Sequence, residues 1–357
     1  MSSHHRISFT SKLIKHMPAT ILSNVILDGK PVPADDAQVR LSSRLAMYGE
    51  GCFDTLRAYE GGFLHPEKHL MRLHRGIELL GRDTPPPLRN TDSFLEMLAL
   101  FLKSNEAMDE QVRIRVQVWA DDHTTGFRPG NTSTRFVITG SRLETDRVHG
   151  VHKVHKVDKV HKVDKVHKVH KVDKVNEPDE PHESEVPYSP DVKCIVNPVS
   201  LITSRFRRIP ACSLSPDVKW TNSINYILAA REAQQKQADD ALMLTHSGLV
   251  SETTVANIFW MSSDSVFTPS VDCDLLPGIT RGVLLDIYDQ AGMPLVEGEF
   301  GPDALAGADI VWICNSVREI CPVGRLDEHR FDPDPLFLGT LNDQFETYKR
   351  EHMQYVR

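Results

Sequence analysis

The chain has 357 residues, of which 40% are hydrophobic and 25% are charged, a composition that is ordinary for a globular protein. Its formal net charge of -8 gives no reason to expect nucleic acid or an anionic membrane as a partner, and no apolar run approaches the roughly 20 residues that span a bilayer. Six cysteines are scattered without metal-site spacing, which predicts free thiols in a cytoplasmic protein and no metal site. The length predicts two domains.

The first part of the chain predicts an extension followed by a small domain. Residues 1–21 are basic and mildly amphipathic, but they lack the continuous apolar segment of a signal peptide, so we expect an N-terminal extension. Residues 22–146 are expected to form a small α/β domain. Its first elements are a hairpin over Asn24–Val32, in which Asp-Gly gives the turn, and two strands over Cys52–Tyr59 and Gly62–Leu64.

Two helices and further strands complete this predicted domain. Pro66 suits the first turn of a helix. Apolar residues follow it at helical spacing, at Leu70, Leu73, Ile77 and Leu80. A second helix is expected over 91–103. In the strand that follows, over 112–120, Arg113 and Arg115 lie on one face and apolar residues lie on the other.

Residues 147–186 differ from the rest of the chain. Between Val151 and Lys174 the sequence repeats Val-His-Lys or Val-Asp-Lys every three residues, and an acidic stretch with prolines follows. A period of three matches neither a strand nor a helix, so the valines cannot gather on one buried face. We therefore expect a disordered, low-complexity insertion and linker. Its histidines could bind a transition metal, but nothing fixes their geometry, which favours a solvated linker.

The last part of the chain, residues 187–357, predicts a larger domain of mixed strands and helices. Strands are expected over 191–200 and 308–316, and helices over 221–236 and 280–291. Because strands and helices do not alternate in a regular rhythm, an α+β domain is favoured over a doubly wound one.

Lys219 is the candidate nucleophile. It follows Ser-Pro-Asp-Val and precedes Trp220, where an extended segment meets a predicted helix. A lysine becomes a useful nucleophile only when it sheds its proton or is held as an imine. The position alone is weak support, because a lysine with apolar neighbours more often extends along a helix surface.

Three further positions each have a structural and a functional interpretation. Glu252 follows an apolar pair at a turn, where it could cap the turn or pair with a buried cation such as a protonated ring nitrogen. Gly278, Ile279 and Thr280 open a helix, whose free amides and positive dipole end suit a phosphate, although any helix start has these features. Arg57 lies in an otherwise apolar strand and needs an anion, either a carboxylate or a ligand.

Taken together and in this order, these residues resemble the class IV aminotransferases, the fold type IV family of pyridoxal phosphate (PLP) enzymes. The family includes branched-chain and D-amino-acid aminotransferases and 4-amino-4-deoxychorismate lyase. The matching stretches are YGEGCFDTLRAYEGGFLHPEKHLMRLHRGIELLG, VKWTNSINYILAAREAQQKQADDALMLTHSGLVSETTVANIFW, LLPGITR and ADIVWICNSVREICPV. The resemblance runs from about Val25 to about Val323, interrupted by the insertion. It implies a two-domain α+β fold, a small α/β domain followed by a larger mixed domain, with PLP between them and a homodimer completing each site.

The resemblance also implies a role for each matching residue. Lys219 would hold PLP as an imine and move the proton between the substrate α-carbon and the cofactor. Glu252 would keep the pyridine nitrogen protonated, with Asn257 supporting its loop. The residues implied for the phosphate are Arg57, Ile279, Thr280 and Ser316, and Tyr48 is implied for the substrate side. The histidines around the first-domain helix, His65, His69 and His74, are expected to be surface or packing residues.

Two departures from the family pattern bear on the substrate. Trp119-Ala120-Asp121 stands where some relatives carry a Thr-Arg-Gly that holds a substrate carboxylate, which weighs against a D-amino-acid aminotransferase of the usual design. Arg115 or Arg128 could substitute for that arginine. Ile224 stands where branched-chain aminotransferases carry a tyrosine, five residues after the lysine.

The reaction itself has two candidate assignments. The run Cys314-Asn315-Ser316 is similar to the lyases, whereas the run from Glu319 to Val323 is similar to the transaminases. We favour an aminotransferase that acts between a small, branched-chain-like amino acid and a 2-oxo acid. The close alternative is 4-amino-4-deoxychorismate lyase, which releases pyruvate and 4-aminobenzoate. A PLP-binding homologue without turnover is disfavoured, because Lys219 and Glu252 are both present.

Overall fold

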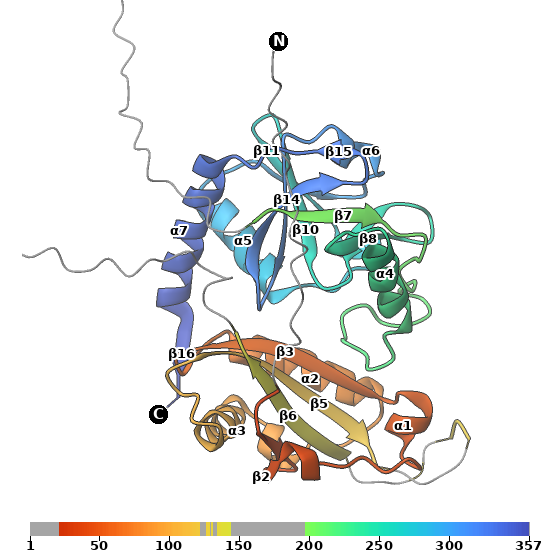
Figure 1. Cartoon of the computed structure of the whole chain (residues 1–357), viewed down its shortest axis with the longest axis vertical. Helices are drawn as coiled ribbons and strands as arrows, with labels where there is room; N and C mark the ends of the chain where they lie inside the picture. Colours follow the sequence, from red (N-terminus) through yellow and green to blue (C-terminus); the bar gives the residue numbers. More distant parts are fainter. Residues whose placement is uncertain (1–20, 122–125, 129, 131–133, 144–196, 357) are drawn as a thin grey trace, which may run out of the picture.

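The computed structural model describes residues 21–121, 126–128, 130, 134–143 and 197–356. Within this part of the chain, two β-sheets and their helices form two bodies, one above the other in Figure 1. The whole predicted insertion at 147–186, and residues 1–20 of the predicted extension, lie outside the described residues.

The first sheet is built from the N-terminal part of the chain and closed by its C-terminus. In spatial order its strands are β16 (Met353–Tyr355), β4 (Gly62–Leu64), β3 (Gly51–Tyr59), β5 (Gln111–Ala120), β6 (Thr134–Arg142), β1 (Asn24–Leu27) and β2 (Lys30–Pro33). Every neighbouring pair is antiparallel. The predicted hairpin, formed by β1 and β2, is confirmed, and so is the strand–turn–strand of β3 and β4.

One face of this sheet forms a hydrophobic core with its helices. Helices α2 (Pro66–Leu79) and α3 (Thr91–Ser104) contribute to this core, whereas the short helix α1 (Arg44–Tyr48) lies outside it. Val112, Ile114, Val116 and Val118 of β5 are fully buried in this core, as their alternation with Arg113 and Arg115 predicts. Gly76 allows α2 to pack directly on β3, because an added Cβ would lie 2.7 Å from Cys52.

The second sheet is mixed, as the irregular order of its predicted elements suggests. In spatial order its strands are β12 (Leu295–Gly298), β11 (Ser265–Pro269), β10 (Asn257–Ser262), β13 (Ile310–Asn315), β14 (Glu319–Leu326), β7 (Val199–Thr203), β8 (Asp240–Leu244) and β9 (Val250–Thr253), and β15 (His329–Arg330) pairs with β14. The pairs β11–β12, β14–β7 and β7–β8 are parallel, and the others are antiparallel.

The helices beside the second sheet are α4 (Ile224–Gln235), α5 (Ile279–Gln290), α6 (Asp303–Ala306) and α7 (Pro335–His352). Helix α4 begins three residues later than the predicted Thr221, because the amide of Thr221 donates to the carbonyl oxygen of Gly51 (2.9 Å) and keeps this segment extended. Among the described residues, no helix combines the length and the apolar character that crossing a bilayer requires.

Helix α7 joins the two bodies. It runs down the left side of Figure 1 from the upper body, and the chain then continues into β16, which pairs with β4 in the lower sheet. The sequence patterns described above did not predict this helix or this strand. The C-terminal segment therefore connects the two sheets, beside the point where the candidate residues converge.

Candidate active site

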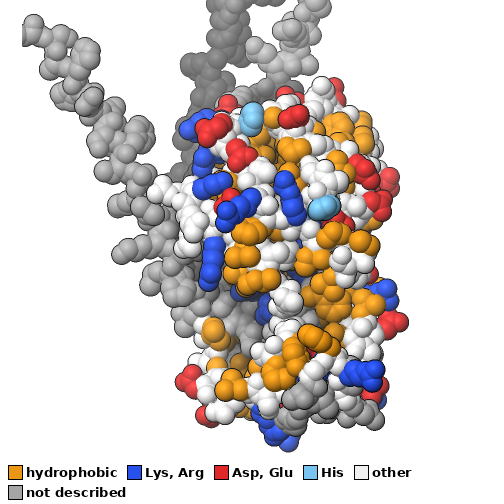
Figure 2. All heavy atoms as spheres, turned by 90° about the vertical axis from the view of Figure 1, so that its right-hand side faces the viewer, with side chains coloured by type: hydrophobic (Ala, Val, Ile, Leu, Met, Phe, Trp, Pro, Cys, Tyr) orange, Lys and Arg blue, Asp and Glu red, His pale blue; other side chains and the backbone are white. Residues whose placement is uncertain are grey.

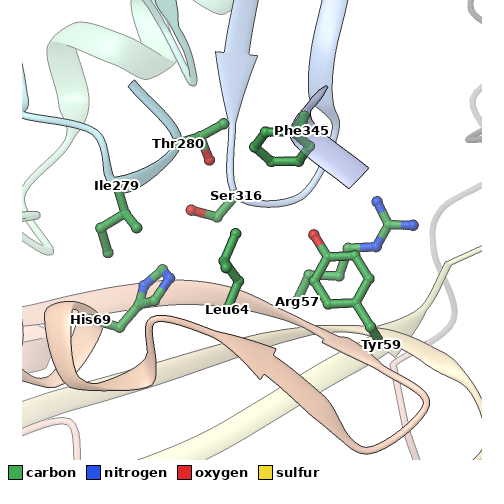
Figure 3. A pocket seen from close by; sticks show the side chains of 8 residues that line it. All are labelled: Arg57, Tyr59, Leu64, His69, Ile279, Thr280, Ser316 and Phe345. Atoms are coloured by element: carbon green, nitrogen blue, oxygen red, sulfur yellow. The ribbon is translucent and has the colours of Figure 1, made fainter. Parts of the chain in front are cut away.

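Side chains from both bodies surround one cavity, which contains about 260 Å³ of empty space, part of it open to solvent. Figure 3 shows them converging from the lower sheet and from the upper body. The lining residues are Arg57 and Tyr59 of β3, Leu64 of β4, His69 of α2, Ile279 and Thr280 of α5, Ser316 of the β13–β14 turn, and Phe345 of α7. All four residues that the resemblance implied for the phosphate are in this set. Whether they bind a phosphate stays a prediction.

Arg57 is the buried cation of the cavity, with 2% of its surface exposed. Its NH1 donates to the carbonyl oxygen of Val317 (2.8 Å) and lies 3.6 Å from a carboxylate oxygen of Glu319, and its NH2 donates to Gln111. Among the described residues, none is hydrogen-bonded to its Nε. A buried arginine nitrogen without a partner is costly, which is a reason to expect an anionic ligand here.

The start of α5 faces the same cavity through Ile279 and Thr280. No side chain among the described residues caps this helix end, where the first amides have no partners within the helix. A glycine is required at position 278, immediately before α5, because a Cβ added there would lie only 2.0 Å from Oδ1 of Asn257. The predicted turn therefore presents amides, a hydroxyl and a positive dipole end to the cavity.

Lys219 is fixed to the first sheet through its backbone. The amide of Phe53 donates to its carbonyl oxygen (2.9 Å), and its Nζ lies 5.9 Å from the centre of the Phe53 ring. Burial, followed by the positive charge of Arg72, lowers the pKa of Lys219 to about 8 from its ordinary 10.5. The negative charges of Asp54 and Glu252 raise this pKa, so the amine lies close enough to both carboxylates to interact with them electrostatically.

Glu252 lies in β9 and is 5% exposed. Its carboxylate accepts hydrogen bonds from the Asn257 side chain and the Leu276 amide, both 3.2 Å, and it pairs with Arg208 at 3.2 Å. Burial raises the pKa of Glu252, and the charge of Arg208 opposes this rise. Asn257 also donates to the carbonyl oxygen of Leu276 (2.9 Å), so it supports both the Glu252 strand and the turn before α5, as the resemblance implied for its loop.

A buried network beside Lys219 was not predicted from the sequence. Asp54 lies 2.8 Å from Nδ1 of His69 and accepts hydrogen bonds from Arg72 through both carboxylate oxygens (2.7 and 2.9 Å). Burial alone would raise the pKa of Asp54, but Arg72 and His69 hold it well below its usual range. Burial lowers the pKa of His69. His69 thus has more than the packing role expected for it, because it also lines the cavity.

Two signals in the sequence could have found this network. Asp54 lies on the same face of its strand as the core residues Cys52, Leu56 and Ala58, and a carboxylate on a core face needs buried cations. His69 and Arg72 are three residues apart, which places them on one face of a helix.

The two residues considered for the substrate, Arg115 and Tyr48, are placed differently, and neither lines the cavity. Arg115 is partly buried, its guanidinium lies 3.4 Å from the centre of the Phe53 ring, and burial followed by the charge of Arg113 lowers its pKa to about 10. Phe53 thus contacts both Arg115 and Lys219. Tyr48 does not line the cavity, and its hydroxyl accepts a hydrogen bond from the amide of Gly126 (3.0 Å). Arg128, the alternative to Arg115, is exposed.

Comparison with known proteins identifies the family. The sequence model of the amino-transferase class IV family matches residues 51–176 and 172–326. The chain is similar to an aminodeoxychorismate lyase of Bacillus subtilis (strain 168), with 25% identity over 314 residues that cover 85% of this chain and 87% of the relative. It is also similar to a putative branched-chain-amino-acid aminotransferase of Methanocaldococcus jannaschii, with 26% identity over 303 residues, 85% of this chain and 88% of the relative.

The fold is that of the PLP fold type IV enzymes. A crystal structure of the branched-chain aminotransferase from the archaeon Thermoproteus uzoniensis, with norvaline, superimposes with a TM-score of 0.74 at 21% identity, covering 94% of this chain and 100% of that one. The chain belongs to the class IV aminotransferases, a family of PLP-dependent enzymes. Its relatives include both aminotransferases and lyases.

The lining of the cavity suits the phosphate of PLP, and Glu252 and Lys219, which are not among its lining residues, suit the ring nitrogen and the carbonyl group. An anionic phosphate needs hydrogen-bond donors, and the site offers Nε of Arg57 and the start of α5, which have no side-chain partner within the described part of the chain, and the hydroxyl of Ser316. A protonated ring nitrogen needs a fixed carboxylate, which Glu252 provides. A carbonyl group needs an amine that loses its proton readily, which Lys219 provides.

Proposed function

We propose that the chain is a PLP-dependent aminotransferase that moves an amino group between a small, branched-chain-like amino acid and a 2-oxo acid. The observation that carries the proposal is the convergence of Arg57, Ile279, Thr280 and Ser316 on one cavity, from separate segments of the chain. When bound, PLP supplies an electron-withdrawing ring that stabilises negative charge at the substrate α-carbon. The protein supplies binding, orientation and proton transfer.

Lys219 is the residue proposed to bind the cofactor's carbonyl carbon and to move the proton. A pKa of about 8 leaves about a tenth of the amine neutral at pH 7, against less than about one part in a thousand for an ordinary lysine. The same amine can accept a proton from the substrate α-carbon and later return it, because its pKa lies close to neutral pH.

The two ends of the cofactor are assigned to different elements. Arg57, the start of α5 and Ser316 would hold the phosphate. Glu252 would bond the ring nitrogen, and the contacts of its carboxylate with Asn257 and the Leu276 amide fix its direction before any ligand arrives.

Arg115 is proposed to hold a substrate carboxylate. Among the described residues it pairs with no carboxylate, and its guanidinium lies over the same aromatic ring as Lys219. Tyr48 is proposed to line the substrate entrance, with the support that it contacts the segment around Gly126 between β5 and β6.

The test is a direct assay of both reactions. The purified chain is incubated with a branched-chain amino acid and 2-oxoglutarate, and glutamate is followed. In parallel, aminodeoxychorismate is supplied and pyruvate is followed. Glutamate formation that disappears in Lys219→Ala supports the proposal. Formation of pyruvate without amino transfer would make the lyase the first candidate and the aminotransferase the second.

The lyase is kept as the second candidate because of specific observations. The relative from Bacillus subtilis is an aminodeoxychorismate lyase, and its similarity spans most of both chains. Ile224 is 59% exposed where branched-chain aminotransferases carry a tyrosine. Against the lyase, Glu319 is buried and contacts Arg57, and it belongs to the run that resembles the transaminases.

We further propose a homodimer. Large apolar side chains are exposed on α1 at Met47 and on α4 at Ile224 and Ile227. Figure 2 shows hydrophobic side chains gathered across the middle of the face that carries these helices. An exposed apolar surface of this kind is typical of protein interfaces. The mass of the purified chain in solution, measured by light scattering, tests this proposal.

The domain division and the location are also proposals. We place a small domain at 22–146 and a large domain at 187–357, supported by the separate cores of the two sheets, with the C-terminal strand β16 reaching from the large domain into the sheet of the small one. A cytoplasmic location is supported by the cysteines: those in the described residues are all free thiols. Limited proteolysis tests the division, because cleavage is expected first within 147–186.

A further inference from the structure

Helix α7 brings a buried lysine close to the cavity. Phe345 of this helix lines the cavity, and Lys349 lies one turn further along with 3% of its surface exposed. Its Nζ lies 2.6 Å from Oε1 of Glu319 and 4.6 Å from the centre of the Tyr59 ring. Lys349 belongs to none of the four segments through which the chain resembles its family.

Glu319 connects this lysine to Arg57. One carboxylate oxygen, Oε1, accepts hydrogen bonds from Lys349 and from the Tyr59 hydroxyl (2.8 Å), and the other, Oε2, lies 3.6 Å from NH1 of Arg57. Glu319 has φ 59°, a left-handed conformation that costs free energy for a residue with a side chain.

The distances show which cation forms the closer ion pair with the Glu319 carboxylate. At 2.6 Å Glu319 forms a short ion pair with Lys349, whereas its contact with Arg57 is too long for a hydrogen bond. A carboxylate that paired closely with Arg57 would neutralise the guanidinium and compete with an anionic ligand. A second acid, Glu346, also lies 2.6 Å from Nζ of Lys349, but 42% of its side chain is exposed, so solvent screens its charge more than that of the buried Glu319.

We infer that Lys349 is a positioning residue for the phosphate end of the site: it holds Glu319 against Tyr59, so that the charge of Arg57 stays available to a phosphate ester. The inference rests on the proposed function. It differs from a purely structural ion pair between α7 and β14, which would affect folding without distinguishing phosphorylated from unphosphorylated ligands.

The test is a binding titration of the full-length chain, freed of any co-purified cofactor, with PLP and with pyridoxal, which lacks the phosphate. Lys349→Met should weaken PLP binding by about tenfold or more and change pyridoxal binding by less than about twofold. Lys349→Arg should restore most of the PLP affinity. Lys236→Met is the matched control, because Lys236 also pairs with a glutamate on its own helix but is 54% exposed at the end of α4.

A double variant tests whether Lys349 affects PLP binding through Glu319. In a Glu319→Gln background, Lys349→Met should have little further effect on the ratio of PLP to pyridoxal affinity. The inference is overturned if wild type binds PLP and Lys349→Met weakens both ligands equally or neither. If Lys349→Met does not fold, Glu319→Gln should keep the wild-type PLP affinity, because the charge of Arg57 is available without the carboxylate, and a loss of about tenfold or more overturns the inference. A wild-type chain that binds no PLP contradicts the proposed function itself, and this inference with it.

Discussion

The amide of Phe53 donates a 2.9 Å hydrogen bond to the carbonyl oxygen of Lys219. Phe53 and Arg57 lie on the same face of β3, four residues apart, which is roughly 13 Å along a strand. One strand thus sets the separation between the reactive amine and the buried guanidinium.

Gly51→Ala should displace Lys219 without touching the phosphate end. The carbonyl oxygen of Gly51 accepts from the Thr221 amide, and an added Cβ would lie 2.6 Å from the Val118 carbonyl oxygen and 3.0 Å from the Thr221 hydroxyl. A shift of the lysine by about 1 Å is expected to slow the reaction by about a hundredfold. Gly301→Ala, where an added Cβ meets no atom within 4 Å, is the control. Equal activities of the two variants would contradict the role given to this contact.

Capture of PLP by the cofactor-free chain should follow the titration of Lys219. Because its pKa is lowered to about 8, the rate should rise with pH to a midpoint near 8 and then level off. A lysine at its ordinary pKa of 10.5 would give a rate that still rises above pH 9. Stopped-flow absorption between pH 6 and 10 distinguishes the two.

The same titration predicts a change in stability with pH. Between pH 8 and 10.5 the unfolded chain holds a proton on Lys219 that the folded chain has lost, so this residue makes the free energy of unfolding increase with pH across that window. Lys219→Met should remove this increase. Denaturant unfolding at several pH values measures it, and identical pH profiles for the variant and the wild type would count against the lowered pKa.

Substitution of two charged neighbours should move this midpoint in opposite directions. The charge of Asp54 raises the pKa of Lys219, so Asp54→Asn should bring the midpoint below 8. The charge of Arg115 lowers it, so Arg115→Gln should bring the midpoint above 8. Thermal unfolding of both variants shows whether the fold is retained. Two shifts in the same direction would refute the assigned electrostatics.

Gly278→Ala should disturb both the phosphate cradle and Glu252. Its Cβ would lie 2.0 Å from Oδ1 of Asn257, and displacement of that side chain removes its hydrogen bond to Glu252. PLP affinity should fall by about tenfold or more. The matched control is Gly282→Ala, on the same helix, where the space is open and alanine should stabilise by about 0.5–1 kcal/mol. Calorimetric titration with PLP compares them.

Local patterns predicted most elements of the fold. The alternation in β5, the Asp-Gly turn between β1 and β2 and the proline at the start of α2 each depend on neighbouring residues, and the structure confirms them. Strand β16 was not predicted, because it forms by pairing with β4, far away in the sequence. The start of α4 was placed too early because the contact between Gly51 and Thr221 joins residues 170 positions apart.

The order of the motifs along the chain predicted the main residues of the candidate site. The structure adds contacts between side chains of different elements, which motifs do not describe. Arg57, Thr280 and Ser316 were chosen by resemblance, and the structure places them around one cavity. The Asp54 network and Lys349 depend on which side chains meet across elements. Neither the spacing nor the residue types reveal that Lys349 is buried, since lysines near the end of a helix are usually solvated.

The most direct test of the central claim is the absorption spectrum of the purified chain with PLP. Wild type should show a visible absorption band that persists through gel filtration. Lys219→Ala should lose this band, and Lys236→Ala, at the exposed end of α4, should retain it. A wild-type chain that takes up no PLP, or a band that survives in Lys219→Ala, would contradict the assignment of Lys219 as the residue that binds the cofactor.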